Sequence, residues 1–244
     1  MGLLTGISRR AWGVWALVVF AACAGSAVVL LAFVPGLERR RALARRAAGA
    51  IFRLTGTPVE VSGLELLPPG PCIVVANHAS YVDGVLMQAV LPPRFAFVVK
   101  NEMDRMPLAG FLLRRLGTEF VARFNAREGA SDTARLVRHS GGGNSMCVFP
   151  EGTFHPERGL RRFRMGAFYA ATRGGLPVAP VAITGTRVML PAGKWLPRPS
   201  AICVRVSLPI EPQGRGRDAA HALADTVRQH IIEGCEEDCA EHLD

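Results

Sequence analysis

Tyrosine and tryptophan are scarce in this sequence, with two and three residues among 244, and two of the tryptophans lie in one apolar run near the N-terminus. A nucleic-acid-binding protein would use such stacking side chains together with a basic reading surface. No serine or cysteine stands in a Gly-x-Ser-x-Gly pattern, so the nucleophile elbow of a covalent hydrolase is also missing. The formal net charge of +9 therefore indicates a phosphate-bearing partner other than nucleic acid, such as an anionic membrane or a phosphorylated substrate.

Cysteine is too scattered to form a disulfide framework. Three of the six cysteines lie inside apolar, strand-like runs, which is typical of reduced, buried thiols in a cytosolic domain. Cys235, Cys239 and His242 lie close together near the end of the chain, but their spacing does not match the usual zinc patterns. We therefore expect no metal site and no disulfides.

Charged residues are absent from Ala11 to Val34. A helix of that length is roughly 36 Å long, enough to cross a hydrocarbon layer of about 30 Å. Trp12 and Trp15 lie at its first end, where aromatic residues of membrane interfaces are common. A cleaved signal peptide would have a shorter run and a clear cleavage site, and a buried core helix would rarely be so long and uncharged. The run predicts a membrane helix.

A basic segment follows the apolar run and contains one acid, Glu38, against Arg39, Arg40, Arg41, Arg45, Arg46 and Arg53. This excess is larger than that of Arg9 and Arg10 before the run, so the positive-inside tendency predicts that the rest of the chain faces the cytoplasm. Residues 37–55 predict a second helix that lies on the membrane, with arginines paired with anionic headgroups. A hairpin within one leaflet would explain the same residues. The anchor is thus expected over 1–56.

Beyond residue 56 the apolar residues form short runs with two kinds of periodicity. Runs rich in β-branched residues predict strands at 59–61, 72–76, 95–99, 119–122, 146–149, 178–183 and 202–208. Amphipathic stretches predict helices at 83–90, 107–116, 130–139, 165–172 and 219–232. Strands that alternate with helices are typical of an α/β sandwich. We expect one domain over 57–244, with a largely parallel sheet of about seven strands.

A histidine and an aspartate lie where one strand ends and a helix begins. His78 follows the strand at 72–76, and Asp83 comes five residues later. A carboxylate on one ring nitrogen selects the tautomer and supports the imidazolium that forms when the other nitrogen takes a proton. The pair could therefore act as a general base on a hydroxyl group. Equally, His78 could hydrogen-bond a loop while Asp83 caps the helix.

A second segment, Phe149-Pro150-Glu151-Gly152-Thr153, follows another predicted strand about seventy residues later. In this order and spacing, the two segments resemble the glycerolipid acyltransferases, the lysophosphatidate acyltransferase family. Weaker blocks also fit that family, and they are Lys100-Asn101-Glu102-Met103 with Pro107, Gly110 and Arg123, Phe163-Arg164-Met165-Gly166, and residues 176–181. The resemblance covers residues 54–212.

The resemblance implies transfer of a fatty acyl group from acyl-CoA or acyl carrier protein to the sn-2 hydroxyl of lysophosphatidate. It implies that His78 is the general base, that Asp83 orients it, and that Lys100 stabilises the oxyanion. Arg123 would bind the acceptor phosphate, and the turn Glu151-Gly152-Thr153 would take part in acceptor binding. No metal or redox cofactor is implied.

The sequence departs from the family at Phe154, because many members carry a basic residue directly after the Glu-Gly-Thr turn. Arginines return only later, at Arg158, Arg161, Arg162 and Arg164. The departure leaves the acceptor headgroup open, and a different lysolipid or a glycolipid would be compatible with the same chemistry. A non-catalytic membrane scaffold on the same fold is the other alternative.

Overall fold

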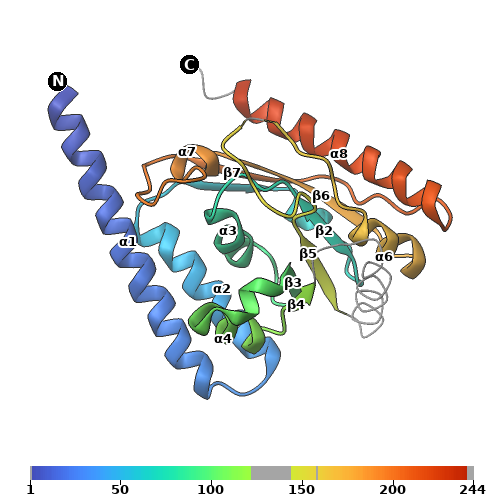
Figure 1. The fold of residues 1–244 in the computed structure, drawn as a ribbon, viewed down its shortest axis with the longest axis horizontal. Coiled ribbons are helices and arrows are strands. Elements are labelled where there is room, and N and C mark those ends of the chain that lie inside the picture. The colour runs from blue at the N-terminus through green and yellow to red at the C-terminus, as the bar shows by residue number, and fades with distance from the viewer. Residues whose placement is uncertain (1, 122–143, 158, 241–244) are drawn as a thin grey trace.

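A seven-stranded sheet with helices on both faces forms the body of the molecule in the computed structural model (Figure 1). The structure describes residues 2–121, 144–157 and 159–240. The order of the strands across the sheet is β1-β7-β6-β2-β5-β3-β4. The strands are β1 (Val59–Ser62), β2 (Ile73–Ala76), β3 (Phe95–Lys100), β4 (Glu119–Val121), β5 (Ser145–Val148), β6 (Val178–Thr184) and β7 (Ile202–Val206).

Most of the sheet is parallel. Strands β6, β2, β5, β3 and β4 pair in parallel, whereas β7 pairs antiparallel with β6 and carries β1 parallel to itself. The residues of β2 and β5 are all buried, as expected for central strands of a sheet that is covered on both faces. The predicted α/β fold with a largely parallel sheet is confirmed, and the antiparallel junction at β6 and β7 is a feature that the strand patterns did not predict.

The helices divide between the two faces. They are α1 (Gly2–Phe33), α2 (Leu37–Leu54), α3 (Val82–Val90), α4 (Pro107–Arg115), α6 (Gly166–Gly174), α7 (Thr186–Met189) and α8 (Arg217–Ala240), with short 3₁₀ helices η1 (Leu64–Leu66) and η2 (Asn101–Arg105). Side chains alternate along β2, so Ile73 and Val75 pack with α6 and α8, whereas Val74 packs with α2 and α3 on the other face. Each face of the sheet therefore has its own hydrophobic core.

Helix α1 is long and apolar enough over Ile7–Phe33 to cross a membrane, by length and composition. It lies outermost, beside α2, on the same face as α3 (Figure 1). The two tryptophans expected at a membrane interface hydrogen-bond the end of α2, where Trp12 Nε1 donates to the Thr55 carbonyl over 2.9 Å and Trp15 Nε1 to the Leu54 carbonyl over 3.1 Å. The predicted helix pair is present. The two bonds join the first half of α1 to the C-terminal end of α2.

The arginines of α2 do not all face outward, which corrects the expectation that they pair with lipid headgroups. Arg40 donates to the Val34 carbonyl, Arg45 to the Ala89 and Val90 carbonyls, and Arg41 is buried among backbone carbonyls of the loops after α3 and α4. Arg39, Arg46 and Arg53 are exposed. Helix α2 thus packs closely on the rest of the molecule. The predicted domain boundary after residue 56 stays a prediction.

Element ends differ from the predicted ones by a few residues in most places. The largest differences are at α1, which begins at Gly2 and not at the predicted Ala11, and at α8, which continues beyond the predicted 219–232 to Ala240. The helix predicted at 130–139 lies outside the described residues, as does the last residue of the strand predicted at 119–122.

Candidate active site

The two predicted motif segments meet at one edge of the sheet. His78 follows β2 and the Glu151 turn follows β5, and these strands are parallel neighbours. Strand β6 pairs with β2 on its other side and leads into α7. Because the carboxyl ends of parallel strands share one edge, three loops converge there.

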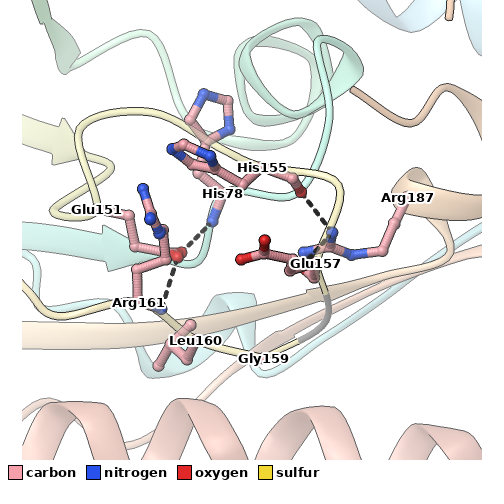
Figure 2. Close-up of a pocket in the computed structure, with 8 residues that line it drawn as sticks. All are labelled: His78, Glu151, His155, Glu157, Gly159, Leu160, Arg161 and Arg187. Atoms are coloured by element: carbon pink, nitrogen blue, oxygen red, sulfur yellow. Dashed lines mark hydrogen bonds between the residues drawn. The ribbon is translucent and has the colours of Figure 1, made fainter. Parts of the chain in front are cut away.

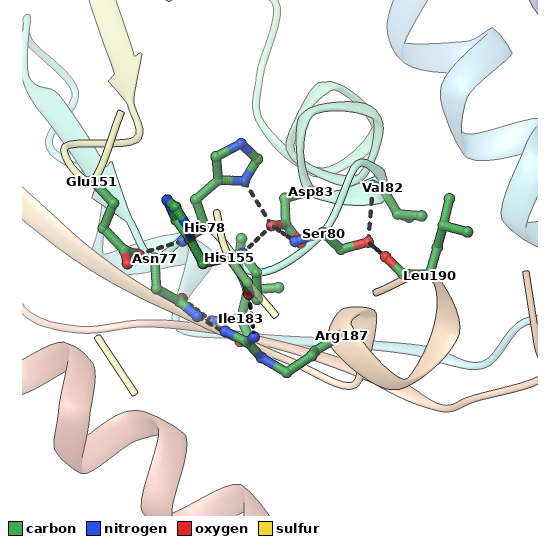
Figure 3. Close-up of polar contacts among 11 residues, drawn as sticks. Asn77, His78, Ser80, Val82, Asp83, Glu151, His155, Ile183, Arg187 and Leu190 are labelled. Atoms are coloured by element: carbon green, nitrogen blue, oxygen red, sulfur yellow. Dashed lines mark hydrogen bonds and ion pairs between the residues drawn. The ribbon is translucent and has the colours of Figure 1, made fainter. Parts of the chain in front are cut away.

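Asn77 secures the end of β2. Its side-chain amide donates to the Ile183 carbonyl over 2.9 Å, and its Oδ1 accepts from the Ile183 N–H over 2.7 Å (Figure 3). The buried amide therefore continues the pairing of β2 with β6 by one further step. This contact holds the backbone of the next residue, His78, against the sheet.

His78 and Asp83 are in direct contact, with Nδ1 of the ring 2.9 Å from Oδ2 of the carboxylate. The same Oδ2 accepts the backbone N–H groups of Ala79 at 2.7 Å and Ser80 at 2.8 Å, and Asp83 is fully buried (Figure 3). Since an ionised carboxylate has only acceptor atoms, the His78 Nδ1 must be the donor. The lone pair of the neutral ring is then on Nε2, the nitrogen that faces away from Asp83.

Aromatic rings surround His78. Phe149 stacks on its imidazole with the ring centroids 4.5 Å apart, and Phe154 meets it edge-on at 4.7 Å. Tyr81 in turn packs edge-on against Phe154. Contacts on two sides restrict rotation of the imidazole about its side-chain bonds, while 19% of the His78 side chain stays exposed. The ring is thus held in place and still open to a reactant.

Glu151 joins the histidine loop to the loop that follows β5. Its Oε1 accepts the His78 backbone N–H over 2.7 Å, and its Oε2 accepts the Arg161 backbone N–H over 2.9 Å. Burial raises the pKa of the Glu151 carboxyl above its ordinary value, and these two hydrogen bonds oppose that shift. Both oxygens are committed to main-chain groups, so this carboxylate positions the loops, and the predicted contact of Glu151 with the acceptor stays a prediction.

The remaining predicted site residues lie in different places. Gly152 has a φ of 74°, and a Cβ atom there would lie 2.4 Å from Nε of Arg164, so only glycine fits this turn. Thr153 is half-buried in the same turn. Lys100 is exposed at the end of β3, and β5 separates that strand from β2. Arg123 lies outside the described residues.

A cavity of about 110 Å³ opens beside His78 (Figure 2). Its walls are His78, Glu151, His155, Glu157, Gly159, Leu160, Arg161 and Arg187. Lys100 and Thr153, which were predicted site residues, do not line this cavity. The cavity is large enough for a small polar group and presents both imidazole and guanidinium side chains to it.

Arg187 at the start of α7 holds part of the cavity wall in place. Its Nη1 donates to the backbone carbonyls of His155, Pro156 and Glu157 at 2.7, 3.2 and 2.8 Å. Neither Arg187 nor His155 is among the site residues predicted from the sequence. A signal was present, because Arg187 comes four residues after the predicted strand at 178–183, whose carboxyl end reaches the same sheet edge.

The cysteines described as buried, Cys72, Cys147 and Cys203, lie in the strands or next to them, as predicted. Burial raises the pKa of the Cys72 and Cys147 thiols, which keeps both protonated. Within the described ranges no three His, Cys, Asp or Glu side chains are grouped so that they could hold a metal ion. His242 is not among the described residues.

Sequence comparisons identify related proteins. A family model described as Acyltransferase matches residues 58–184. The chain is 31% identical over 170 residues to the 1-acyl-sn-glycerol-3-phosphate acyltransferase of Haemophilus influenzae, which is 68% of this chain and 70% of that protein. It is 28% identical over 188 residues to the protein of the same name from Saccharomyces cerevisiae, covering 75% of this chain but only 62% of the yeast protein.

The fold is similar to that in the crystal structure of the 1-acyl-sn-glycerophosphate (LPA) acyltransferase PlsC from Thermotoga maritima. The TM-score is 0.76 at 25% sequence identity, and the match covers 98% of both chains. The family model covers the sheet edge at which His78, Asp83 and Glu151 meet. The resemblance inferred from the two motif segments is therefore confirmed, and the chain belongs to the acyltransferase family.

Proposed function

We propose that the protein is a 1-acylglycerol-3-phosphate O-acyltransferase. It moves a fatty acyl group from acyl-CoA or acyl carrier protein to the sn-2 hydroxyl of lysophosphatidate and makes phosphatidate. The observation that carries this proposal is the 2.9 Å contact between His78 Nδ1 and Asp83 Oδ2 beside an open cavity, in a chain of the acyltransferase family. The related proteins named above carry that activity in their names.

In the proposed reaction His78 acts as general base and no covalent enzyme intermediate forms. Nε2 takes the proton of the acceptor hydroxyl while its oxygen attacks the thioester carbonyl carbon, and Asp83 stabilises the imidazolium through Nδ1–H. The tetrahedral intermediate collapses with cleavage of the carbon–sulfur bond, and the imidazolium returns its proton to the leaving thiolate. The acyl group ends as an ester on the acceptor, and no metal or redox cofactor takes part.

The acceptor is a lipid, so the enzyme must reach a membrane surface. We infer that α1 inserts into the cytoplasmic membrane and that the sheet domain faces the cytoplasm. Helix α1 has the length and composition for this, and Arg39, Arg46 and Arg53 of α2 remain exposed and available to lipid phosphates. Their spacing of seven residues puts the three on one side of the helix.

Substitution of the base tests the mechanism. We expect His78→Ala to lower acyl transfer to below about 1% of the wild-type rate, because general-base catalysis contributes about 10²- to 10⁴-fold. The assay follows labelled acyl groups from acyl-CoA to lysophosphatidate with the purified protein in detergent. His221→Ala on α8 is the control, since this histidine lies away from the cavity wall. Wild-type-like activity of His78→Ala would exclude the mechanism.

A second acceptor class also has support, because Phe154 places an aromatic ring beside His78 where many relatives carry a basic residue. A panel of lysophosphatidate, lysophosphatidylglycerol, a lyso-aminolipid and a glycolipid distinguishes the two possibilities. We expect lysophosphatidate to react fastest. If it were inert while another acceptor reacted, the substrate assignment would fall and the reaction class would stand.

A further inference from the structure

We propose that Arg161 binds the phosphate group of the acceptor, an inference that rests on the proposed function. Two arginines, Arg161 and Arg187, line the cavity that also contains His78. The residue directly after the Glu-Gly-Thr turn is Phe154, whose ring packs against His78 and carries no charge. Among the described residues, the guanidinium groups available to a phosphate in this cavity are therefore those two, whereas Arg123, to which the resemblance assigned the phosphate, lies outside the described residues.

The two arginines differ in what they already bind. Arg187 is engaged, because its Nη1 donates to three backbone carbonyls of the loop at 155–157. Arg161 is exposed, and its guanidinium has no hydrogen bond or ion pair within the described part of the chain. A guanidinium without a partner can form two parallel hydrogen bonds to phosphate oxygens. Arg161 is thus the arginine of this wall that has all of its guanidinium donors available, whereas Arg187 has Nη1 committed to the loop.

The backbone at Arg161 is fixed relative to the general base. One carboxylate, Glu151, accepts the His78 N–H through Oε1 at 2.7 Å and the Arg161 N–H through Oε2 at 2.9 Å (Figure 2). This buried side chain therefore fixes the separation between the backbone at His78 and the backbone at Arg161. In Figure 2 the Arg161 side chain extends past this carboxylate toward the side on which the two imidazole rings lie.

This geometry suits an acceptor whose reacting hydroxyl and phosphate are joined by a short glycerol arm. With the hydroxyl at His78 Nε2, a phosphate on this short arm stays close to His78, and Arg161 lines the cavity beside that residue. The wall also contains two carboxylates. Both oxygens of Glu151 are directed at backbone N–H groups, and Glu157 is exposed, so water and salt screen its charge.

The test compares Arg161→Ala with Arg162→Ala in the full-length protein. Arg162 is the matched control, because it is an adjacent, exposed arginine outside the cavity wall. The backbone N–H to Glu151 is kept in Arg161→Ala, so the position of His78 is preserved. In Arg161→Ala we expect the KM for lysophosphatidate to rise about 10-fold or more with little change in kcat, because a charged hydrogen bond to the acceptor is lost. In Arg162→Ala the KM should stay within about twofold of the wild-type value.

A binding measurement separates this inference from the proposed function. Glycerol 3-phosphate carries the phosphate without an acyl chain, and calorimetric titration records its binding whether or not the protein is active. We expect the wild type and Arg162→Ala to bind it and Arg161→Ala to lose at least about 10-fold in affinity. Equal affinity in wild type and Arg161→Ala, an equal loss in both variants, or no binding to the wild type would overturn the role of Arg161. Binding without acylation of lysophosphatidate would refute the proposed function alone.

Discussion

At the scale of single residues, Glu151 has more structural consequence than its predicted place in an acceptor-binding turn suggests. Its two oxygens accept the backbone N–H groups of His78 and Arg161. In Glu151→Gln the amide oxygen could accept one of these groups, but the NH₂ group would then face the other donor. We expect kcat to fall, because the side chain at this position then no longer accepts both the His78 N–H and the Arg161 N–H, and the proposed base is held less firmly.

The same variant tests the protonation of Glu151. Burial raises the pKa of this carboxyl above its ordinary value of 4.5, so the folded protein holds the proton more tightly than the unfolded chain. The free energy of unfolding therefore falls as pH rises through the interval between the two pKa values. Denaturant titrations from about pH 4 to about pH 8 should show this decline in the wild type and a smaller one in Glu151→Gln. Parallel pH profiles for the two proteins would contradict it.

At the scale of elements, α2 uses its arginines for two purposes. Arg41 is 3% exposed and donates through Nε to the Leu116 carbonyl over 2.8 Å, with longer contacts from its other nitrogens to Pro93, Arg94 and Gly117. Burial lowers the pKa of this guanidinium, which nevertheless stays charged. The buried side of the helix repeats every three or four residues, as an amphipathic helix requires, and is formed by Arg41, Ala44, Ala48 and Phe52.

We expect Arg41→Ala to lower the free energy of unfolding by about 2–4 kcal/mol, because several buried carbonyls lose their donor at once. Arg46→Ala, on the exposed side of the same helix, should change it by less than about 0.5 kcal/mol. Chemical denaturation of both variants in detergent measures the difference. A similar effect of the two substitutions would mean that the carbonyl contacts of Arg41 contribute little to stability.

At the scale of the whole molecule, the orientation of the apolar helix in the membrane determines on which side of the membrane the sheet domain lies. The proposal puts α1 in the bilayer and everything after it on the cytoplasmic side. Protease added to sealed vesicles should digest the sheet domain when the cytoplasmic face points outward, and should leave it intact when that face points inward. Digestion of the sheet domain in vesicles whose cytoplasmic face points inward would contradict the proposed orientation, but not the fold.

The sequence alone was sufficient for the features that depend on neighbours in the chain. The charge-free run predicted α1, and β-branched runs predicted the strands, because a buried helix face or strand requires a local periodicity of apolar residues. The spacing of His78 and Asp83 across a strand end allowed the two side chains to meet, and they lie 2.9 Å apart. Motif spacing identified the family.

Only the tertiary structure decided the features that join residues far apart in the chain. Strand order brought the loop after β6, with Arg187, to the loop after β5, and it separated Lys100 from His78 by placing β5 between β3 and β2. Likewise Arg41 is buried because α2 packs over the loops at the ends of α3 and α4. Local periodicity determines which elements form, whereas the order in which they pack determines which side chains meet, because that order buries the apolar faces of all the elements together.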